Sequence, residues 1–310
     1  MKILALTLAL LSVAGVFALA AFQPSLLRSA EADVLFVPAA AKTPRTAKGA
    51  EPAPPEPLPA IAYDGAPSFM QRFDAPLEEK AWYLADFVYR SETQRAGWSK
   101  DHIDLTGSEM VLKLTREPKE FQPYTGAEIS RTNRYHYGRY EVVMRAARGS
   151  GLVSSFFTHT DEHQRPTDHH NEIDFEFLGY DTTMVQLNFY SKEGNMQGHL
   201  VDLPYDAADH YQLYTFEWMP DQIDWYVGDQ HVLRATEAST GLRIPHLPSR
   251  LMMNLWSGSE RQYDWHGRPT FESGSTSRYL CVSYQAPGDA GSPQCSDWFV
   301  ADVPRLGIAG

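Results

Sequence analysis

The chain has 310 residues and a formal net charge of −12, with 39 acidic side chains against 27 Lys and Arg. Because no run of Lys or Arg appears, we expect no nucleic acid among its partners. The length fits either two domains or one large β domain with an N-terminal extension.

The first 22 residues predict export. Met1 and Lys2 precede an apolar run from Ile3 to Phe22, and Ala18-Leu19-Ala20 offers a small-x-small cleavage site. The run is also about long enough to span a bilayer. Residues 1–22 are therefore a signal peptide, which we expect to be cleaved, or an uncleaved anchor that tethers the protein to a membrane. In both cases we expect a secreted, periplasmic or cell-envelope protein.

Residues 23–60 form an Ala/Pro-rich stretch that includes P-A-P-P-E-P-L-P. With so few apolar side chains this stretch cannot bury a core. We interpret it as an extended linker, with a disordered tail as the alternative. The folded domain is expected over residues 61–310, with its first structure near residues 63–73.

The patterns that follow are nearly all typical of short β-strands. Apolar runs and alternations predict strands at 110–114, 140–144, 152–158, 184–190, 214–218, 223–227, 231–233, 251–256 and 279–284. Gly228-Asp229 predicts a tight turn and therefore a hairpin. No window has a sustained helical period, and no internal repeat is present. We therefore predict an all-β fold, either a sandwich or a barrel.

One stretch, H-N-E-I-D-F-E-F-L-G-Y from His170 to Tyr180, concentrates acidic side chains. Glu172, Asp174 and Glu176 alternate with apolar residues, so a strand here points all three carboxylates to one face. Like charges on neighbouring same-face positions repel, and a purely structural strand has no reason to accept that repulsion. Glycoside hydrolysis needs such a set, because one carboxylate attacks the sugar and another protonates the leaving oxygen. The alternative is a solvated acidic face on an edge strand.

Other predicted strands carry polar or aromatic residues opposite their apolar side chains. Glu128 precedes Ile129, Asn188 lies in Q-L-N-F-Y, and Asn254 and Trp256 alternate in M-M-N-L-W. Singly, each fits a satisfied core amide or ordinary packing. Together they describe a sheet face suited to a polysaccharide, whose rings stack on aromatics and whose hydroxyls meet amides.

The sequence contains two cysteines, Cys281 and Cys295. In an exported chain we expect them to pair and to hold the C-terminal tail against the last strand. A metal site is the poorer alternative, because two Cys without nearby His provide too few ligands.

Residues 68–271 resemble glycoside hydrolase family 16, in particular its bacterial lichenases and exopolysaccharide-depolymerising members. The most specific segment is N-E-I-D-F-E-F-L-G, which keeps the family's E-[ILV]-D-x-E pattern. The segments Y-G-R-Y-E-V-V-M-R, G-S-G-L-V-S-S-F-F-T, D-T-T-M-V-Q-L-N-F-Y and R-L-M-M-N-L-W-S-G also look like lichenase segments, in the same order. The resemblance implies a concanavalin A-like β-jelly-roll sandwich of two curved antiparallel sheets.

The resemblance also implies roles for particular residues. Glu172 would be the nucleophile, Glu176 the general acid/base, and Asp174 the residue that orients the nucleophile. The resemblance and the strand patterns together suggest substrate contacts from Glu128, His159, His170, Asn188, Tyr190, Asn254, Trp256 and Trp265. Neighbouring negative charges raise the pKa of Glu176, as a general acid requires.

Three positions depart from the family pattern. His170 stands where lichenases usually carry a Trp, and His159 where they carry a Tyr. Because two rings that would stack on sugar are lost, the histidines argue against the lichenase substrate itself. Leu280 occupies the place of an Asp that binds calcium, so we expect that site to be absent or altered, with no cofactor and no metal ligand.

We therefore expect a secreted, endo-acting, retaining hydrolase of a β-linked glucan, either β-1,3-1,4-glucan or a bacterial exopolysaccharide. Its partner would be the polysaccharide, and we expect a monomer. A glucan or xyloglucan transglycosylase is the first alternative, because it shares the covalent intermediate. A non-catalytic carbohydrate-binding protein is the second, and the Glu172, Asp174 and Glu176 set argues against it because binding needs no proton donor.

Overall fold

The computed structural model describes residues 66–160 and 170–302. The expected signal segment (1–22) and linker (23–60) lie outside these residues. The first strand described, β1 (Phe69–Arg72), begins within the range expected for the start of the domain.

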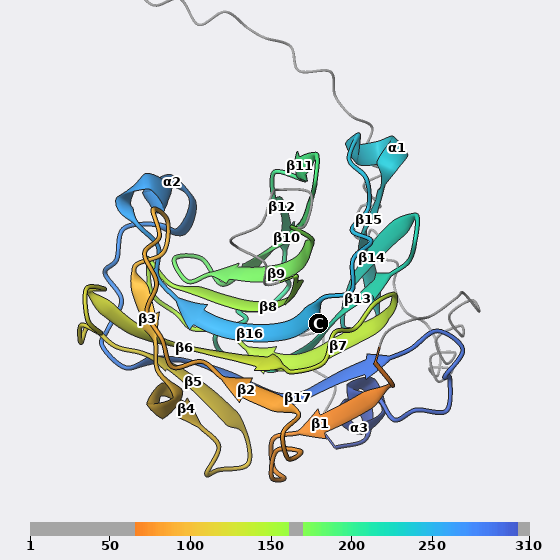
Figure 1. Cartoon of the computed structure of the whole chain (residues 1–310), viewed down its shortest axis with the longest axis horizontal. Coiled ribbons are helices and arrows are strands. Elements are labelled where there is room, and N and C mark those ends of the chain that lie inside the picture. The colour runs from red at the N-terminus through yellow and green to blue at the C-terminus, as the bar shows by residue number, and fades with distance from the viewer. Residues whose placement is uncertain (1–65, 161–169, 303–310) are drawn as a thin grey trace, which may run out of the picture. The chain divides into compact units, whose positions relative to one another are not determined.

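The described residues form two sheets that pack face to face (Figure 1). The eight-stranded sheet has the order β15 (Gln230–Thr236), β14 (Gln222–Val227), β13 (Gln212–Trp218), β7 (Gly138–Arg145), β17 (Ser275–Gln285), β5 (Met110–Leu114) and β4 (Ile103–Asp104), with β1 paired to β17. The nine-stranded sheet has the order β11 (Gly194–Asn195), β10 (Met184–Ser191), β9 (Glu172–Leu178), β8 (Val153–His159), β16 (Arg250–Trp256), β6 (Tyr124–Arg131) and β2 (Trp82–Leu84), with β12 (His199–Asp202) on β10 and β3 (Ala96–Trp98) on β6. All strand pairs are antiparallel except β3 with β6. The predicted all-β sandwich is confirmed.

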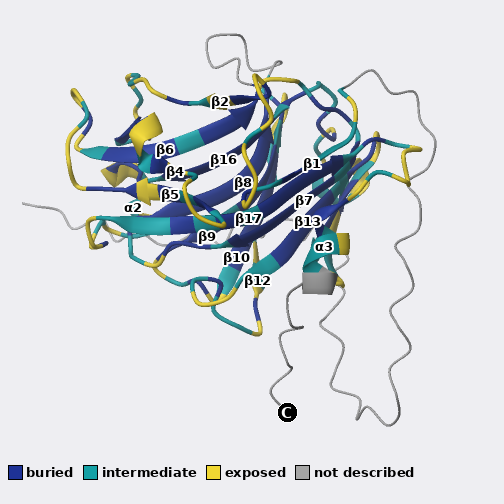
Figure 2. Cartoon of the chain, turned by 90° about the horizontal axis from the view of Figure 1, so that it is seen from below, coloured by how far each residue is buried: buried dark blue, intermediate teal, exposed yellow. Residues whose placement is uncertain are grey.

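The core lies between the sheets and is rich in aromatic rings. Phe175 of β9 reaches across to Tyr214 and Phe216 of β13, with ring centroids 5.6 and 6.4 Å apart. Burying one such side chain contributes about 1.5–3 kcal/mol. Figure 2 shows the buried residues running along the middle strands of both sheets. Since alternate residues of these strands point inward, the others are left to form the two outer faces.

The predicted strands all exist, and most of their ends lie within two residues of the prediction. The hairpin also forms, with Gly228 at φ 61° in the turn, a backbone conformation that favours glycine. Strands β1 to β4, β11 and β12 were not predicted. They have only two to four residues each, too few for an alternation to be recognised.

Three short helices were not predicted, because no window of the sequence has a sustained helical period: α1 (Glu237–Thr240), α2 (Tyr263–His266) and α3 (Cys295–Asp302). The longest has eight residues, about two turns, and such a segment shows little period and depends on tertiary anchoring. None of the helices described is long and apolar enough to cross a bilayer.

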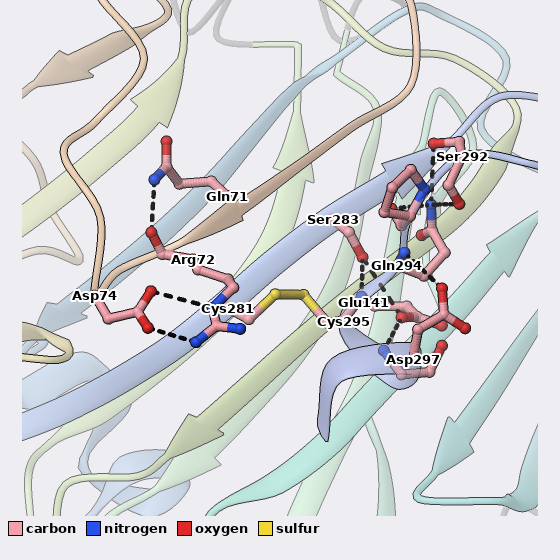
Figure 3. The surroundings of a disulfide bond; sticks show 12 residues. Gln71, Arg72, Asp74, Glu141, Cys281, Ser283, Ser292, Gln294, Cys295 and Asp297 are labelled. Atoms are coloured by element: carbon pink, nitrogen blue, oxygen red, sulfur yellow. Dashed lines mark hydrogen bonds and ion pairs between the residues drawn. A yellow bond between two sulfur atoms is a disulfide. The ribbon is translucent and has the colours of Figure 1, made fainter. Parts of the chain in front are cut away.

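The anchor of α3 is a disulfide between Cys295 and Cys281 of β17, shown in Figure 3. Beside it, the Cys295 backbone N–H donates to Ser283 Oγ at 3.0 Å, and the Ser296 N–H donates to the buried Glu141 at 2.8 Å. Leu280 packs on the apolar cluster around this disulfide. The C-terminal helix is thus held on the outer face of the eight-stranded sheet.

Candidate active site

The three acidic side chains of β9 project from the outer face of the nine-stranded sheet. Ile173, Phe175 and Phe177, which alternate with the three acids, are fully buried on the core side. Strand pairing then fixes the neighbours of each carboxylate, because residues at the same register lie side by side across the sheet. Figure 1 shows this face curving upward at both ends, toward α2 on one side and β11 on the other.

Glu172 lies between Tyr190 of β10 and His159 of β8 in the register. Its Oε2 is 2.6 Å from His170 Nε2 and 3.6 Å from His159 Nε2. The His170 ring stacks on Tyr190, with centroids 4.9 Å apart. Burial acts to raise the pKa of Glu172, but the charges of the two imidazoles and hydrogen bonds from His170 and Asp174 outweigh it, so this pKa is lowered. Glu172 is therefore held as the carboxylate, the form that can attack.

Asp174 lies between the two glutamates on the strand and is only 2% exposed. Burial, followed by the charges of Glu172 and Glu176, raises the pKa of Asp174 well above its ordinary value. A neutral Asp174 can donate its proton in the hydrogen bond that it shares with Glu172. This bond can orient the Glu172 carboxylate and stabilise its negative charge.

Glu176 lies at the register of Gln186 on β10 and Ser155 on β8. Gln186 Nε2 donates to Glu176 Oε2 at 3.2 Å, and Trp265 Nε1 of α2 donates to Gln186 Oε1 at 2.9 Å. Burial and then the charge of Glu172 raise the pKa of Glu176 to about 8, while the Gln186 hydrogen bond opposes this rise. Glu176 is therefore protonated near neutral pH and can act as an acid.

The proposed substrate contacts lie on the same face of the sheet or at its border. Asn254 of β16 is paired with Glu128 of β6, and its Nδ2 donates to Glu128 Oε2 at 3.4 Å. Trp256 at the end of β16 packs against Trp265, with ring centroids 6.0 Å apart. Among the described residues, the buried Oδ1 atoms of Asn188 and Asn254 have no hydrogen-bond partner. These two amide oxygens can accept from sugar hydroxyls.

His159 and His170, which we expected to contact substrate, both lie beside Glu172. Both imidazoles point their Nε2 atoms at Glu172. Their rings are 4.9 Å apart, and His159 is buried while the His170 side chain is 39% exposed. Both histidines are therefore neighbours of the Glu172 carboxylate.

Sequence reasoning did not assign Gln186 or Tyr89 to the site. Gln186 alternates with Asn188 and Tyr190 on β10, so the alternation already placed it on this face. Burial raises the pKa of the Tyr89 phenol, and the charges of Glu128 and Glu172 raise it further, which places Tyr89 close to both acids. Tyr89 lies outside any strand, so no periodic pattern could have revealed it.

An ionised carboxylate and a protonated carboxyl on one sheet face, among amides and indoles, are the groups that glycoside hydrolases use. The sequence model of Glycosyl hydrolases family 16 matches residues 90–273 of the chain. The chain belongs to this family.

Relatives of known name support the assignment. The chain is 37% identical over 218 residues to a β-glucanase of Acetivibrio thermocellus, covering 70% of this chain and 61% of that protein. It is 39% identical over 181 residues to a β-glucanase of Bacillus subtilis, covering 57% and 70%. The solved β-glucanase of Bacillus licheniformis superposes with a TM-score of 0.64 at 34% identity, covering 71% of this chain and 99% of that one. The chain thus spans less than two thirds of the length of the Acetivibrio protein.

Proposed function

We propose that the protein is a retaining, endo-acting β-glucanase. The observation that carries the proposal is that two glutamates on one strand have pKa values shifted in opposite directions, lowered at Glu172 and raised to about 8 at Glu176. Such a pair can perform a double displacement, in which one carboxylate attacks the sugar and the other group donates the proton. Glu172 attacks the anomeric carbon while Glu176 gives its proton to the departing oxygen. Glu176, now a base, takes a proton from a water molecule whose oxygen attacks the anomeric carbon, and the bond between the sugar and Glu172 breaks.

Action within the chain is supported by how far the polar face extends. Tyr190 and Asn188 lie on one side of β9, on β10, whereas Asn254 and Glu128 lie on the other side, on β16 and β6. Sugar units can therefore bind on both sides of the carboxylates. An enzyme that removes terminal units needs binding sites mainly on one side.

The substrate class follows from the relatives and from the two histidines. The relatives above are named β-glucanases, and a further solved neighbour, 33% identical with a TM-score of 0.65, is titled a β-1,3-1,4-glucanase. We take β-linked glucan as the substrate class, with mixed-linkage glucan and bacterial exopolysaccharide as the two candidates. Because His170 turns toward Glu172 and stacks on Tyr190, it leaves a narrower platform than a Trp would.

Product analysis tests the proposal. The protein is incubated with mixed-linkage glucan, laminarin, xyloglucan and succinoglycan, and the first-formed reducing end is followed by proton NMR. A β-anomer that later mutarotates supports retention, and internal fragments support endo action. An α-anomer would overturn the mechanism, and products longer than the substrate would assign the protein to transglycosylation.

We further propose that the protein acts outside the cytoplasm. The proposal is supported by the apolar run after Lys2 and by the disulfide between Cys281 and Cys295, since disulfides persist in oxidising compartments. Cell fractionation with mass spectrometry of the N-terminus tests both export and cleavage. Recovery of intact, reduced protein from the cytoplasm would contradict it.

A further inference from the structure

Three ligand atoms suited to a transition-metal ion converge at the nucleophile. His159 is the register partner of Glu172 on β8, and His170 lies two residues before Glu172. Their Nε2 atoms and one carboxylate oxygen of Glu172 all lie within 4.8 Å of one another. In the part of the chain that the structure describes, no other three His, Cys, Asp or Glu side chains form such a group.

The spacing needs little change to hold an ion. Ligands at about 2.1 Å from a tetrahedral zinc ion lie about 3.4 Å apart. Here the two imidazole nitrogens lie 2.6 and 3.6 Å from Glu172 Oε2, on either side of that separation. A side-chain rotation at the more exposed His170 can open its contact to the required distance.

The surroundings hold the ligands in place. The His159 ring is buried and packs with its edge toward Phe157, at a centroid distance of 6.5 Å. The His170 ring is stacked on Tyr190 at an interplanar angle of 17°. The partial exposure of His170 gives an ion access from solvent. Two imidazoles and a carboxylate leave a fourth position open, as in zinc sites with three protein ligands.

The donor set also selects the kind of ion. Imidazole nitrogen suits Zn²⁺ and its first-row neighbours, whereas Ca²⁺ and Mg²⁺ require oxygen ligands. We propose that His159, His170 and Glu172 form a binding site for a divalent ion of the Zn²⁺ class, and that an ion bound there switches the hydrolase off. The inhibitory half rests on the proposed function. An ion bound to Glu172 withdraws electron density from the carboxylate and weakens it as a nucleophile, so we expect ion binding to oppose turnover.

Binding is measured first, because it does not depend on turnover. The chelator-treated full chain is titrated with ZnCl₂ by calorimetry, and with Co²⁺ by its visible absorption. We expect one ion at this site. We also expect His170→Gln and Glu172→Gln each to weaken binding by at least about tenfold, since even indirect partners of metal ligands count for that much. His159→Gln should do the same, and circular dichroism checks that this buried variant folds.

A matched control exists on the other sheet. His231 Nε2 lies 2.6 Å from Asp224 Oδ1, the same contact as that of His170 with Glu172, but Arg234 occupies the same carboxylate. His231→Gln should leave Zn²⁺ affinity unchanged. Equal affinity in the wild type and in His170→Gln would overturn the site.

Inhibition is then measured on polysaccharide. Activity should fall in proportion to Zn²⁺ occupancy and return on adding EDTA. Full occupancy with undiminished activity would overturn the switch. A wild type that binds Zn²⁺ through these residues but cleaves no glucan would instead support the ion site while contradicting the proposed function.

Discussion

The outer faces of the two sheets both carry rows of acidic side chains, with different partners. On the eight-stranded sheet, Glu217 of β13 lies between Asp224 of β14 and Arg139 of β7. Arg139 donates to Glu217 and to the fully buried Glu141, each at 2.6 Å. Asp224 accepts from Arg234 at 2.7 Å. Every carboxylate in this row therefore faces a permanent cation.

On the nine-stranded sheet, no Lys or Arg of the described ranges forms an ion pair with Glu172, Asp174 or Glu176. Their partners are imidazoles and an amide. A guanidinium stays charged at every ordinary pH and so fixes its partner as an anion, which an amide does not do. Burial and mutual repulsion are then free to raise the pKa values of Asp174 and Glu176. Acids paired with arginine hold the fold, and acids left without one are available for proton transfer.

The largest expected effect comes from exchanging one acid for its amide in each row. Glu172→Gln should lower turnover by at least about a thousandfold, because an amide cannot form the glycosyl-enzyme. Its unfolding free energy should change little, since the amide keeps the shape of the carboxyl group. Glu217→Gln should do the reverse and weaken the contact with Arg139 while leaving turnover intact. Polysaccharide assays measure the turnover of both variants, and urea unfolding measures their stability.

Substantial turnover in Glu172→Gln would remove this residue from the role of nucleophile. Affinity electrophoresis of the inactive variant with glucan tests whether the outer face of the nine-stranded sheet still binds the polysaccharide. Loss of binding together with turnover would mean that the substitution disturbs the sheet rather than the chemistry.

Glu176→Ala should separate poor from good leaving groups. A sugar leaving group needs protonation, so polysaccharide cleavage should nearly vanish, whereas an activated aryl glycoside departs without help. The glycosyl-enzyme should then accumulate, because the base that activates water is missing too. Azide, small and already anionic, should restore turnover and yield a β-glycosyl azide. Stopped-flow release of the phenol and NMR of the product provide the measurements.

Equal losses on both substrates with no azide rescue would give Glu176 another role. An α-azide product would mean inversion and would contradict the mechanism as a whole. Glu128→Ala is the control, since it removes a carboxylate from the same face that the mechanism does not use as an acid.

For the acidic row on the eight-stranded sheet (Glu141, Glu217 and Asp224), we expect stability rather than turnover to change. Arg139→Leu leaves Glu141 and Glu217 without their shared cation, and breaking a buried pair in this way is destabilising by about 3–5 kcal/mol. Arg139 is 11% exposed and Glu141 is fully buried, so water cannot readily replace the lost partner. Turnover per folded molecule should not change. Urea unfolding followed by assays at low denaturant tests both statements.

Arg139→Lys provides the matched control, because it keeps the charge and loses only the fork that reaches two carboxylates. It should destabilise less than Arg139→Leu. If both variants lose turnover while still folded, the two outer faces are coupled and the comparison between them fails.

The acidic face of β9 was predictable because its cause is local. A period-two alternation at Glu172, Asp174 and Glu176 fixes both the strand and the direction of its side chains. The strands that flank it are also close in sequence, so Asn188 and Tyr190 could be placed from their own alternation. These features need no knowledge of tertiary structure.

What could not be predicted depends on pairing between distant segments. That β16 lies beside β8, and β6 beside β16, is decided by the packing of the whole sandwich. The same holds for His159, which meets Glu172 only because β8 and β9 are paired at one particular register. A one-residue slip would turn that imidazole to the core. Helix α3 depends on its disulfide and could not be read from eight residues alone.

The smallest predicted effect concerns the pH dependence of kcat/KM. Glu176 must be protonated to act as an acid, so activity should fall as the pH rises through about 8. The hydrogen bond from Gln186 stabilises the ionised form and lowers this pKa. Gln186→Leu removes the donor, so the pKa of Glu176 should rise and the alkaline limb should move to higher pH.

The acidic row on the eight-stranded sheet again provides a matched control. Gln222 donates to Asp224 at 2.6 Å, an amide-to-carboxylate contact like that of Gln186 with Glu176. Gln222→Leu should leave the pH profile unchanged, because Asp224 keeps Arg234 and takes no part in catalysis. If Gln186→Leu moves the alkaline limb to lower pH, the amide does not stabilise ionised Glu176. If Gln222→Leu moves the limb as well, that limb reports on the fold rather than on one acid.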